Sequence, residues 1–240
     1  MTQKLLKPAS SDDWIQLLKA WRIWLLAAML GALIGYIAFV LIPPAFRAQA
    51  SVNVNLNLEK AWPDANSERL LMTYLARETN KLVAVAWDDQ TLTQVVDQVP
   101  GTSLESLRSG VLQLSQPGDG IWHFWADSQD AALAQKMAGS WAQAFYQRAL
   151  QGVDTANQLL ADQAALQQSP ASASLLAEVA RLEKDSLAIN PYIQLSLVQG
   201  ESLPVSRSVS PGIFMLAGCL VAWSATLISL FIAGRKPEKI

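Results

Sequence analysis

Residues that hold metal ions or form disulfides are scarce in this chain. Its 240 residues include one cysteine, Cys219, and one histidine, His123. One cysteine cannot form an intrachain disulfide, and one histidine without further ligands does not make a zinc site. The sequence also contains no glycine-rich phosphate loop and no Gly-x-Ser-x-Gly motif. Asp88 and Asp89 are better explained as a helix cap than as paired acids. We therefore expect no catalytic residues, no metal site, no cofactor and a protein that is not an enzyme.

Charge is absent from two long stretches, residues 23–42 and residues 212–233. At about 1.5 Å per residue, 20 helical residues span about 30 Å, which is the thickness of the hydrocarbon core of a bilayer. Helices in soluble cores are usually shorter and carry charges on one face. The sequence therefore predicts transmembrane helices at 23–42 and at 212–233.

A cleaved signal peptide is the alternative for the first stretch, because Ala48-Gln49-Ala50 resembles a cleavage site. Its uncharged run is longer than the roughly 7–15 apolar residues of a signal peptide, and 22 residues precede it. We therefore expect a retained membrane anchor.

Basic residues gather next to the two apolar stretches. Segments 1–22 and 234–240 carry seven basic residues against three acidic ones, whereas residues 43–211 carry eleven basic and seventeen acidic residues. Lysine and arginine close to a membrane helix resist translocation. We therefore predict that 1–22 and 234–240 are cytoplasmic and that 43–211 lies outside the cytoplasm. Trp14, Trp21 and Trp24 fit the inner membrane interface.

The central domain begins with a strong strand pattern. Apolar and polar residues alternate from Ala48 to Leu58, which indicates a half-buried β-strand. Helical spacing follows, with Thr102 and Glu105 as an expected capping box for a short helix that ends at Gly110. We predict helices at 67–85, 89–99 and 102–110, and a hairpin of strands at 111–115 and 121–126.

The second half of the domain is mostly helical. Asp127 or Ser128 can cap a helix that runs to residue 168, and a second helical stretch covers 171–188. Gly152 allows a bend in the first of these helices. A final strand at 193–198 is expected to pair with the first strand. The predicted fold class is α+β: two transmembrane helices flank an extracytoplasmic α/β base domain with a protruding helical hairpin over about 129–188.

Small residues recur every four positions in both apolar stretches. The first contains Ala27, Gly31 and Gly35, and the second contains Gly218, Ala222 and Thr226. Such ridges let membrane helices approach closely, within or between subunits, although an alanine-rich helix also gives this spacing by chance. Pro204 and Pro211 are expected to keep the connector before the second stretch extended.

Aromatic side chains cluster in the predicted hairpin. Trp122 and Phe124 should point to one face of the sheet and Trp125 to the other, with Trp141 and Phe145 on the following helix. Core packing explains the cluster best, and contact of Trp122 or Trp125 with a glycan is the alternative.

The order of these elements resembles the polysaccharide co-polymerase family, the Wzz-type chain length determinant proteins. The resemblance lies in the strand at 46–54, the strand-to-helix passage at 124–134 and the proline-containing connector at 204–211 before a glycine-bearing apolar stretch. It implies a non-catalytic, ring-forming homo-oligomer of the bacterial inner membrane with a periplasmic central domain. Such a protein regulates the chain length of a surface polysaccharide, for example lipopolysaccharide O-antigen. Its implied partners are membrane lipids, a polysaccharide polymerase and the glycan product, and we expect no nucleic acid partner.

Two departures from the family keep alternatives open. The helical arm is shorter than is typical of members that control O-antigen, and 234–240 lacks the Walker-type ATP site of members fused to a tyrosine kinase. An adaptor that activates a separate cytoplasmic tyrosine kinase is therefore one alternative. A two-span ligand sensor is another, and a membrane-bound enzyme comes last.

Overall fold

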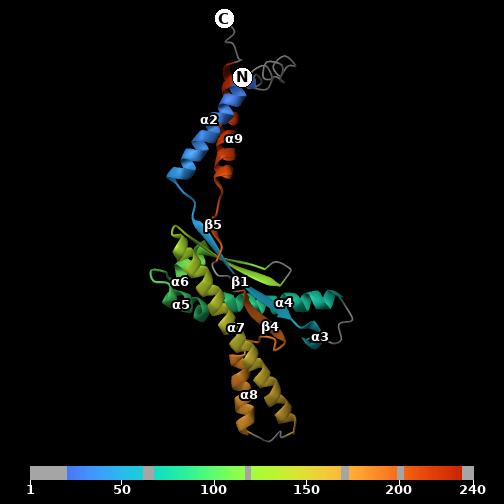
Figure 1. Cartoon of the computed structure of the whole chain (residues 1–240). Coiled ribbons are helices and arrows are strands. Elements are labelled where there is room, and N and C mark those ends of the chain that lie inside the picture. The colour runs from blue at the N-terminus through green and yellow to red at the C-terminus, as the bar shows by residue number, and fades with distance from the viewer. Residues whose placement is uncertain (1–20, 62–67, 117–119, 169–172, 199–202, 234–240) are drawn as a thin grey trace, which may run out of the picture. The chain divides into compact units, whose positions relative to one another are not determined.

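The computed structural model of the chain describes residues 21–61, 68–116, 120–168, 173–198 and 203–233. The chain divides into two compact units (Figure 1). The first, here called the helix pair, joins the chain up to Pro44 with the chain from Arg207 onward; the second, the α/β unit, is Ala45–Ser206. In the sequence, the α/β unit is therefore inserted between two apolar helices.

The helix pair consists of α2 (Trp21–Leu41) and α9 (Pro211–Ala233), which pack against each other. Both apolar stretches are helical, as predicted. The two helices have 21 and 23 residues, which correspond to about 32 and 35 Å of helix. Pro211 is the first residue of α9 rather than the end of an extended connector. Proline suits this position because the N–H that it lacks would have no partner in the first turn.

The α/β unit contains one sheet whose strands run in the order β2-β3-β1-β4, and β5 also pairs with β1. The strands β1 and β3, β1 and β4, and β2 and β3 pair antiparallel. The predicted pairing of the first strand with the strand at 193–198 is confirmed. The strands are β1 (Phe46–Leu56), β2 (Leu112–Ser115), β3 (Ile121–Ser128), β4 (Ile193–Val198) and β5 (Val205–Arg207).

The strand β1 has the two faces that its alternating pattern predicts. Ala48, Ala50 and Val52 are buried, whereas Asn53 and Asn55 are exposed on the opposite face. The strand ends two residues before the predicted position, because the carboxamide oxygen of Asn57 accepts a hydrogen bond from the Lys60 amide at 3.2 Å. This bond caps the short helix α3 (Leu58–Ala61).

The helix α7 packs against β1, β3 and β4, and this contact contains the core of the unit. Trp141 and Phe145 of α7 are fully buried, as is Phe124 of β3. The Trp141 indole also donates to the Ala86 carbonyl oxygen at 2.8 Å, which ties α7 to the end of α4. The helices of the unit are α4 (Glu68–Ala86), α5 (Asp89–Gln98), α6 (Leu104–Ser106), α7 (Ala131–Gln168) and α8 (Ala173–Asp185), and the one-turn segment η1 (Leu107–Val111) follows α6.

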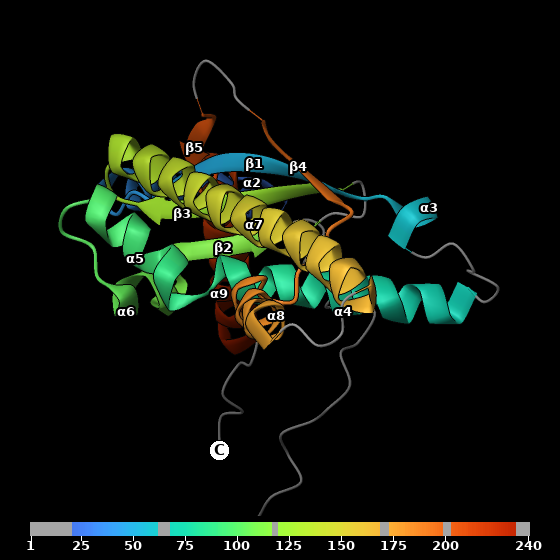
Figure 2. The same cartoon turned by 90° about the horizontal axis from the view of Figure 1, so that it is seen from below.

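The far half of α7 and α8 form the predicted helical hairpin, which extends beyond the sheet in Figure 1. Figure 2 is viewed from below, so that α8 is seen nearly end on. The helix α7 is continuous over 38 residues, about 57 Å. It runs through Gly152 without ending there. A Cβ at Gly152 would lie 3.2 Å from the Ser186 carbonyl oxygen, so this glycine permits close approach of the chain that follows α8. The helix α8 ends before the predicted position because Leu187 and Ala188 both have a φ of 54°.

Two predicted caps are wrong, and the third, Asp88, is confirmed in its position only. The capping box of α6 joins Ser103 and Ser106 rather than Thr102 and Glu105, and Thr102 instead donates its hydroxyl to the Val99 carbonyl at 2.7 Å. At the start of α7, Asp130 accepts a hydrogen bond from the Ala132 amide at 2.9 Å and replaces the predicted Asp127 or Ser128. Asp88 has the extended backbone of an N-cap, but its side chain makes no capping bond. The pattern of polar residues located each helix start to within a few residues but did not identify the capping side chain.

Candidate functional site: the apolar helix pair and the outer sheet face

The close approach of α2 and α9 depends on three glycines. A Cβ at Gly31 would overlap the Gly218 carbonyl oxygen and would lie 2.8 Å from the Ala222 Cβ. A Cβ at Gly35 would overlap the Phe214 carbonyl oxygen, and one at Gly218 would overlap the Gly31 carbonyl oxygen. The three carbonyl oxygens that would be overlapped belong to the backbone of the facing helix and cannot move aside. The small residues at these positions therefore pack the two helices of a single chain against each other.

The remaining residues of the two small-residue ridges flank this contact. Ala27 and Thr226 are half-buried, and the Thr226 hydroxyl donates to the Ala222 carbonyl at 2.8 Å. Cys219 lies in the same interface, where its thiol is 3.1 Å from the Ala28 carbonyl oxygen. A side-chain donor in an apolar layer is thus satisfied by backbone.

Aromatic pairs lie on both sides of the glycine contact. Trp24 and Trp223 meet edge to face with ring centroids 6.5 Å apart, and Phe39 and Phe214 do so at 5.5 Å. Beyond the second pair, the Arg207 guanidinium lies 5.6 Å from the Phe39 ring centroid and donates to the Pro44 carbonyl at 3.0 Å. The positive charge of Arg207 therefore lies at the end of the helix pair where α2 ends and α9 begins.

Large apolar side chains cover the outside of the helix pair. Leu26 is 59% exposed, Ile34 63% and Val221 71%. The core helix of a soluble protein buries such side chains, because exposing each one to water costs about 1.5–3 kcal/mol. Both helices are long and apolar enough, by length and composition, to cross a membrane. These features are consistent with a membrane protein.

The α/β unit has a polar surface, here called the outer sheet face, on the side of the sheet opposite α7. Its side chains alternate with the buried ones along each strand, and those on β2 and β4 are the most exposed. The outer sheet face consists of Arg47, Gln49, Ser51, Asn53 and Asn55 of β1, Gln113 and Ser115 of β2, Ile121, His123, Trp125 and Asp127 of β3, and Gln194, Ser196 and Val198 of β4.

An ion pair joins two strands on this face. Arg47 and Asp127 are opposite each other across β1 and β3, and the guanidinium donates from Nε and Nη2 to the two carboxylate oxygens at 2.7 and 2.6 Å. This bidentate bond, opposed by burial, raises the pKa of Arg47 above its usual value. Asp127, expected to cap a helix, thus holds the sheet together instead.

A second polar group links the same strands one step further along. The His123 Nδ1 atom lies 2.7 Å from the Gln49 amide nitrogen and 2.9 Å from the Ser51 hydroxyl. Donation from the Gln49 amide requires an unprotonated Nδ1. His123 is therefore a sheet-surface residue fixed by two neighbours.

The two tryptophans named as alternatives for glycan contact lie on opposite faces. Trp122 is 5% exposed and stacks on Phe145 with ring centroids 5.6 Å apart, so core packing accounts for it. Trp125 is half-buried on the outer sheet face, with the His123 ring 6.0 Å away and the Arg47 guanidinium 5.9 Å away. Of these two tryptophans, only Trp125 could stack on a ligand.

The connector after β4 touches the sheet through Pro204. Its carbonyl oxygen accepts a hydrogen bond from the backbone N–H of Gln49 at 3.2 Å. The next residue, Val205, begins β5. Proline fits an edge position because it supplies an acceptor without needing a donor partner.

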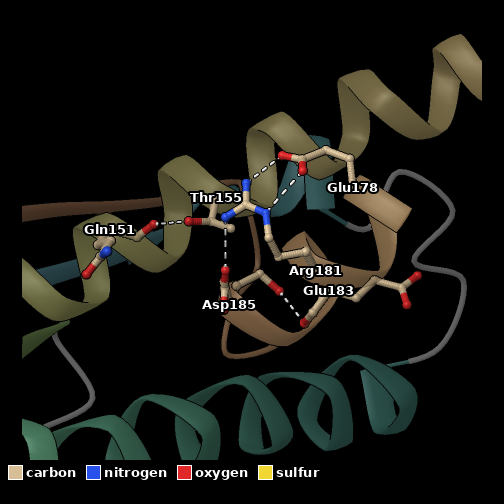
Figure 3. A network of polar contacts seen from close by, with 7 residues as sticks. Gln151, Thr155, Glu178, Arg181, Glu183 and Asp185 are labelled. Carbon is tan, nitrogen blue, oxygen red and sulfur yellow. Dashed lines mark hydrogen bonds and ion pairs between the residues drawn. The ribbon is translucent and has the colours of Figure 1, made fainter. Parts of the chain in front are cut away.

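The helical arm is joined mainly by apolar contact. Val153 and Ala156 of α7 and Val179 and Leu182 of α8 are buried. The polar bonds drawn in Figure 3 lie within one helix or its end: Arg181 binds Glu178 at 2.5 and 3.1 Å and Asp185 at 3.4 Å. The hydrogen bond from Arg181 holds the pKa of Glu178 below its usual value. Arg181, Glu178 and Asp185 therefore stabilise α8.

The base of the arm contains a buried tyrosine. The Asn190 amide donates to the Tyr74 hydroxyl oxygen at 2.5 Å, and the Glu78 carboxylate nearby binds Lys81 at 2.9 Å. Burial and the neighbouring Glu78 charge raise the pKa of Tyr74 above 10.0, and Arg77 and the Asn190 bond oppose them.

Among the residues that the structure describes, no group of three or more histidine, cysteine, aspartate or glutamate side chains could hold a metal ion. No family model matches the chain, and no curated protein matches it. Any functional assignment therefore depends on the geometry of the helix pair, the outer sheet face and the arm.

Sequence patterns alone did not identify the polar pairs of the outer sheet face. Arg47 and Asp127 flank the predicted strands by one residue each, and His123 was read in isolation. The missing information was the register of β1 against β3, which no sequence pattern supplies.

Proposed function

We propose that this protein is a non-catalytic, oligomeric regulator of surface polysaccharide chain length in the bacterial inner membrane, where it acts beside a membrane polymerase. The observation that carries the proposal is the insertion of the α/β unit, with its helical arm, between two apolar helices that pair closely. This is the arrangement that the resemblance to Wzz-type proteins implies.

The helix pair supports a retained anchor over a cleaved leader. The backbone-to-backbone fit of Gly31 and Gly35 against α9 is specific to a helix that stays with the rest of the chain. In the proposed topology, both termini are cytoplasmic and the α/β unit is periplasmic. The segments 1–20 and 234–240, whose charge suggests this orientation, lie outside the described residues.

The pairing of β1 with β4 supports a scaffold role. Because β4 and β5 both pair with β1, the first strand of the unit is a neighbour of its last two strands. The arm then provides a long lateral surface without a catalytic group among its described residues. Such a shape suits contact between copies of the chain, and we propose a closed homo-oligomer.

Deletion of the gene tests the proposal. We expect the length distribution of the surface polysaccharide, separated on a gel, to change while sugar polymerisation continues. Complementation with the wild-type chain should restore the original distribution. A normal distribution in the deletion strain would reject length regulation.

The same strain separates the alternatives. Removal of residues 235–240 should leave the length distribution intact if the protein regulates length by itself. Lost phosphorylation of a cytoplasmic kinase in that variant would instead indicate an adaptor. Images of the purified particle should show a closed ring, and a monomer or dimer would favour a sensor.

A further inference from the structure

We propose that the outer sheet face binds a glycan strand, with one sugar ring stacked on the Trp125 indole. Only the identity of the natural ligand, the exported polysaccharide, rests on the proposed function. The inference itself rests on how the strands arrange polar side chains around this ring.

Polar residues lie next to Trp125 both across the neighbouring strands and along its own strand. The register places Gln113 of β2 opposite it on one side and Gln49 of β1 on the other. His123 and Asp127 lie two positions away along β3, on the same face as Trp125. A ring flanked by amides, an imidazole and a carboxylate offers stacking to the apolar face of a sugar and hydrogen bonds to its hydroxyl groups.

The charges on this face cancel. Arg47 and Asp127 bind each other, and the other residues of the outer sheet face that the structure describes are amides, hydroxyls, His123, Trp125 and the uncharged apolar residues Ile121 and Val198. A phosphate-bearing ligand, such as a nucleic acid or an anionic lipid surface, would find no unbalanced positive charge here. Neutral hydroxyl-rich polymers match such a surface.

The face is open at its edges. Gln113, Asn53 and Ser196 are exposed, and within the described ranges the helix that packs against the sheet, α7, lies on the opposite face. Apart from the indole, the large apolar side chains of this face are Ile121, four positions from Trp125 on β3, and Val198, opposite Ser51 on the outer strand β4. The centre of a protein interface is normally apolar and poor in charge, whereas the positions around Trp125 are polar. The residues of the outer sheet face therefore fit a glycan better than a protein partner.

Two of the side chains around the ring are held in place before any ligand arrives. Gln49 is fixed by His123, and its amide nitrogen is also 3.3 Å from the Ser51 hydroxyl. Side chains already fixed lose less conformational entropy when they bind. Gln113, which is exposed on β2, is the residue that would order on the ligand.

The test measures binding of oligosaccharides to the full chain purified in mild detergent. The probes are short oligosaccharides released by mild acid from the surface polysaccharide of the cells that make the protein. Trp125→Ala should weaken binding by about fivefold or more, and Gln113→Ala by about threefold, from the loss of stacking and of one hydrogen bond. Gln194→Ala is the matched control, because this exposed glutamine lies on β4, away from the ring.

Trp125→Phe should retain most of the affinity because it keeps an aromatic face. If Trp125→Ala does not fold, Gln113→Ala against Gln194→Ala still tests the inference. Equal binding by these two variants, wild-type affinity in Trp125→Ala, or no binding by the wild-type chain would overturn it. Normal polysaccharide length after gene deletion, together with Trp125-dependent binding, would reject the proposed function and leave the binding site standing.

Discussion

Trp24 and Trp223, 199 positions apart in the chain, are joined by a hydrogen bond from the Trp223 indole to the Trp24 carbonyl oxygen at 3.1 Å. Trp24 lies near the start of α2, whereas Trp223 lies in the middle of α9. The end of α9 therefore continues past the level of Trp24. Residues 224–233 carry no charge, so α9 stays apolar beyond its hydrogen bond with Trp24.

Replacing Gly31 by leucine should separate α2 from α9. The new side chain would strike the Gly218 backbone, and overpacking of this kind costs about 1–3 kcal/mol. The measurement is crosslinking between Cys219 and a cysteine introduced by Ala28→Cys, because the Ala28 carbonyl oxygen lies 3.1 Å from the Cys219 thiol. We expect the yield to fall in Gly31→Leu. The control is Ala225→Leu, an equally large change at an exposed position of α9, and an equal yield in both variants would contradict the proposed packing.

Arg47 and Asp127 should be energetically coupled. Their side chains are 30% and 19% exposed, so the pair is weaker than a fully buried one, and we expect a coupling free energy of about 1–2 kcal/mol. A double-mutant cycle with Arg47→Ala and Asp127→Ala, read by thermal unfolding, measures it. The exposed pair of Arg181 and Glu178 serves as control, and its coupling should be smaller. Equal coupling in both pairs would show that Arg47 does not hold the sheet together.

Stability should fall at alkaline pH through Tyr74. Its pKa is raised in the folded state, so its contribution is complete below the unfolded value of about 10 and is lost as pH rises through the folded pKa. Ionisation would place a phenolate beside the Glu78 carboxylate. We expect Tyr74→Phe to flatten the decrease in unfolding temperature above pH 10. A decrease as steep as in the wild-type chain would assign it to other groups.

Gly152 should tolerate alanine but not leucine. Alanine gains about 1 kcal/mol of helix propensity, which offsets crowding of the flexible end of Ile189, so the free energy of unfolding should change little. Leucine would push against the Ser186 carbonyl and should cost about 1–3 kcal/mol. Unfolding temperatures of both variants check this, and equal values would mean that the chain after α8 does not approach α7 closely there.

Elements with a clear period were predictable from the sequence. Alternation identified β1, the uncharged runs identified α2 and α9, and the apolar stripe identified α7. In each case the pattern extends over many residues, because a single environment determines which residues are apolar. That environment is either the medium around the helix or one face of the core. The pairing of β1 with β4 also followed, from the short connections at the two ends of the unit.

Contacts between distant residues were not predictable in the same way. The sequence predicts Asp127 as a helix cap because it precedes a helix. In the structure Asp127 binds Arg47, which is 80 positions earlier. The sequence predicts a bend at Gly152. In the structure the glycine instead makes room for the chain after α8. The candidate ring Trp125 could be placed on a face by alternation, whereas its glutamine neighbours depend on strand register.

The central position of β1 has a consequence for how the chain folds. Phe46 pairs with Ser128, and Ser51 pairs with Val198, so the first strand has no local partner on either edge. During synthesis, both edges stay open until β3 and then β4 have emerged, and open strand edges attract other chains. Contacts this far apart in sequence also form slowly. The strand made first is thus completed last, and a nascent chain cut short before residue 193 would keep an unpaired edge.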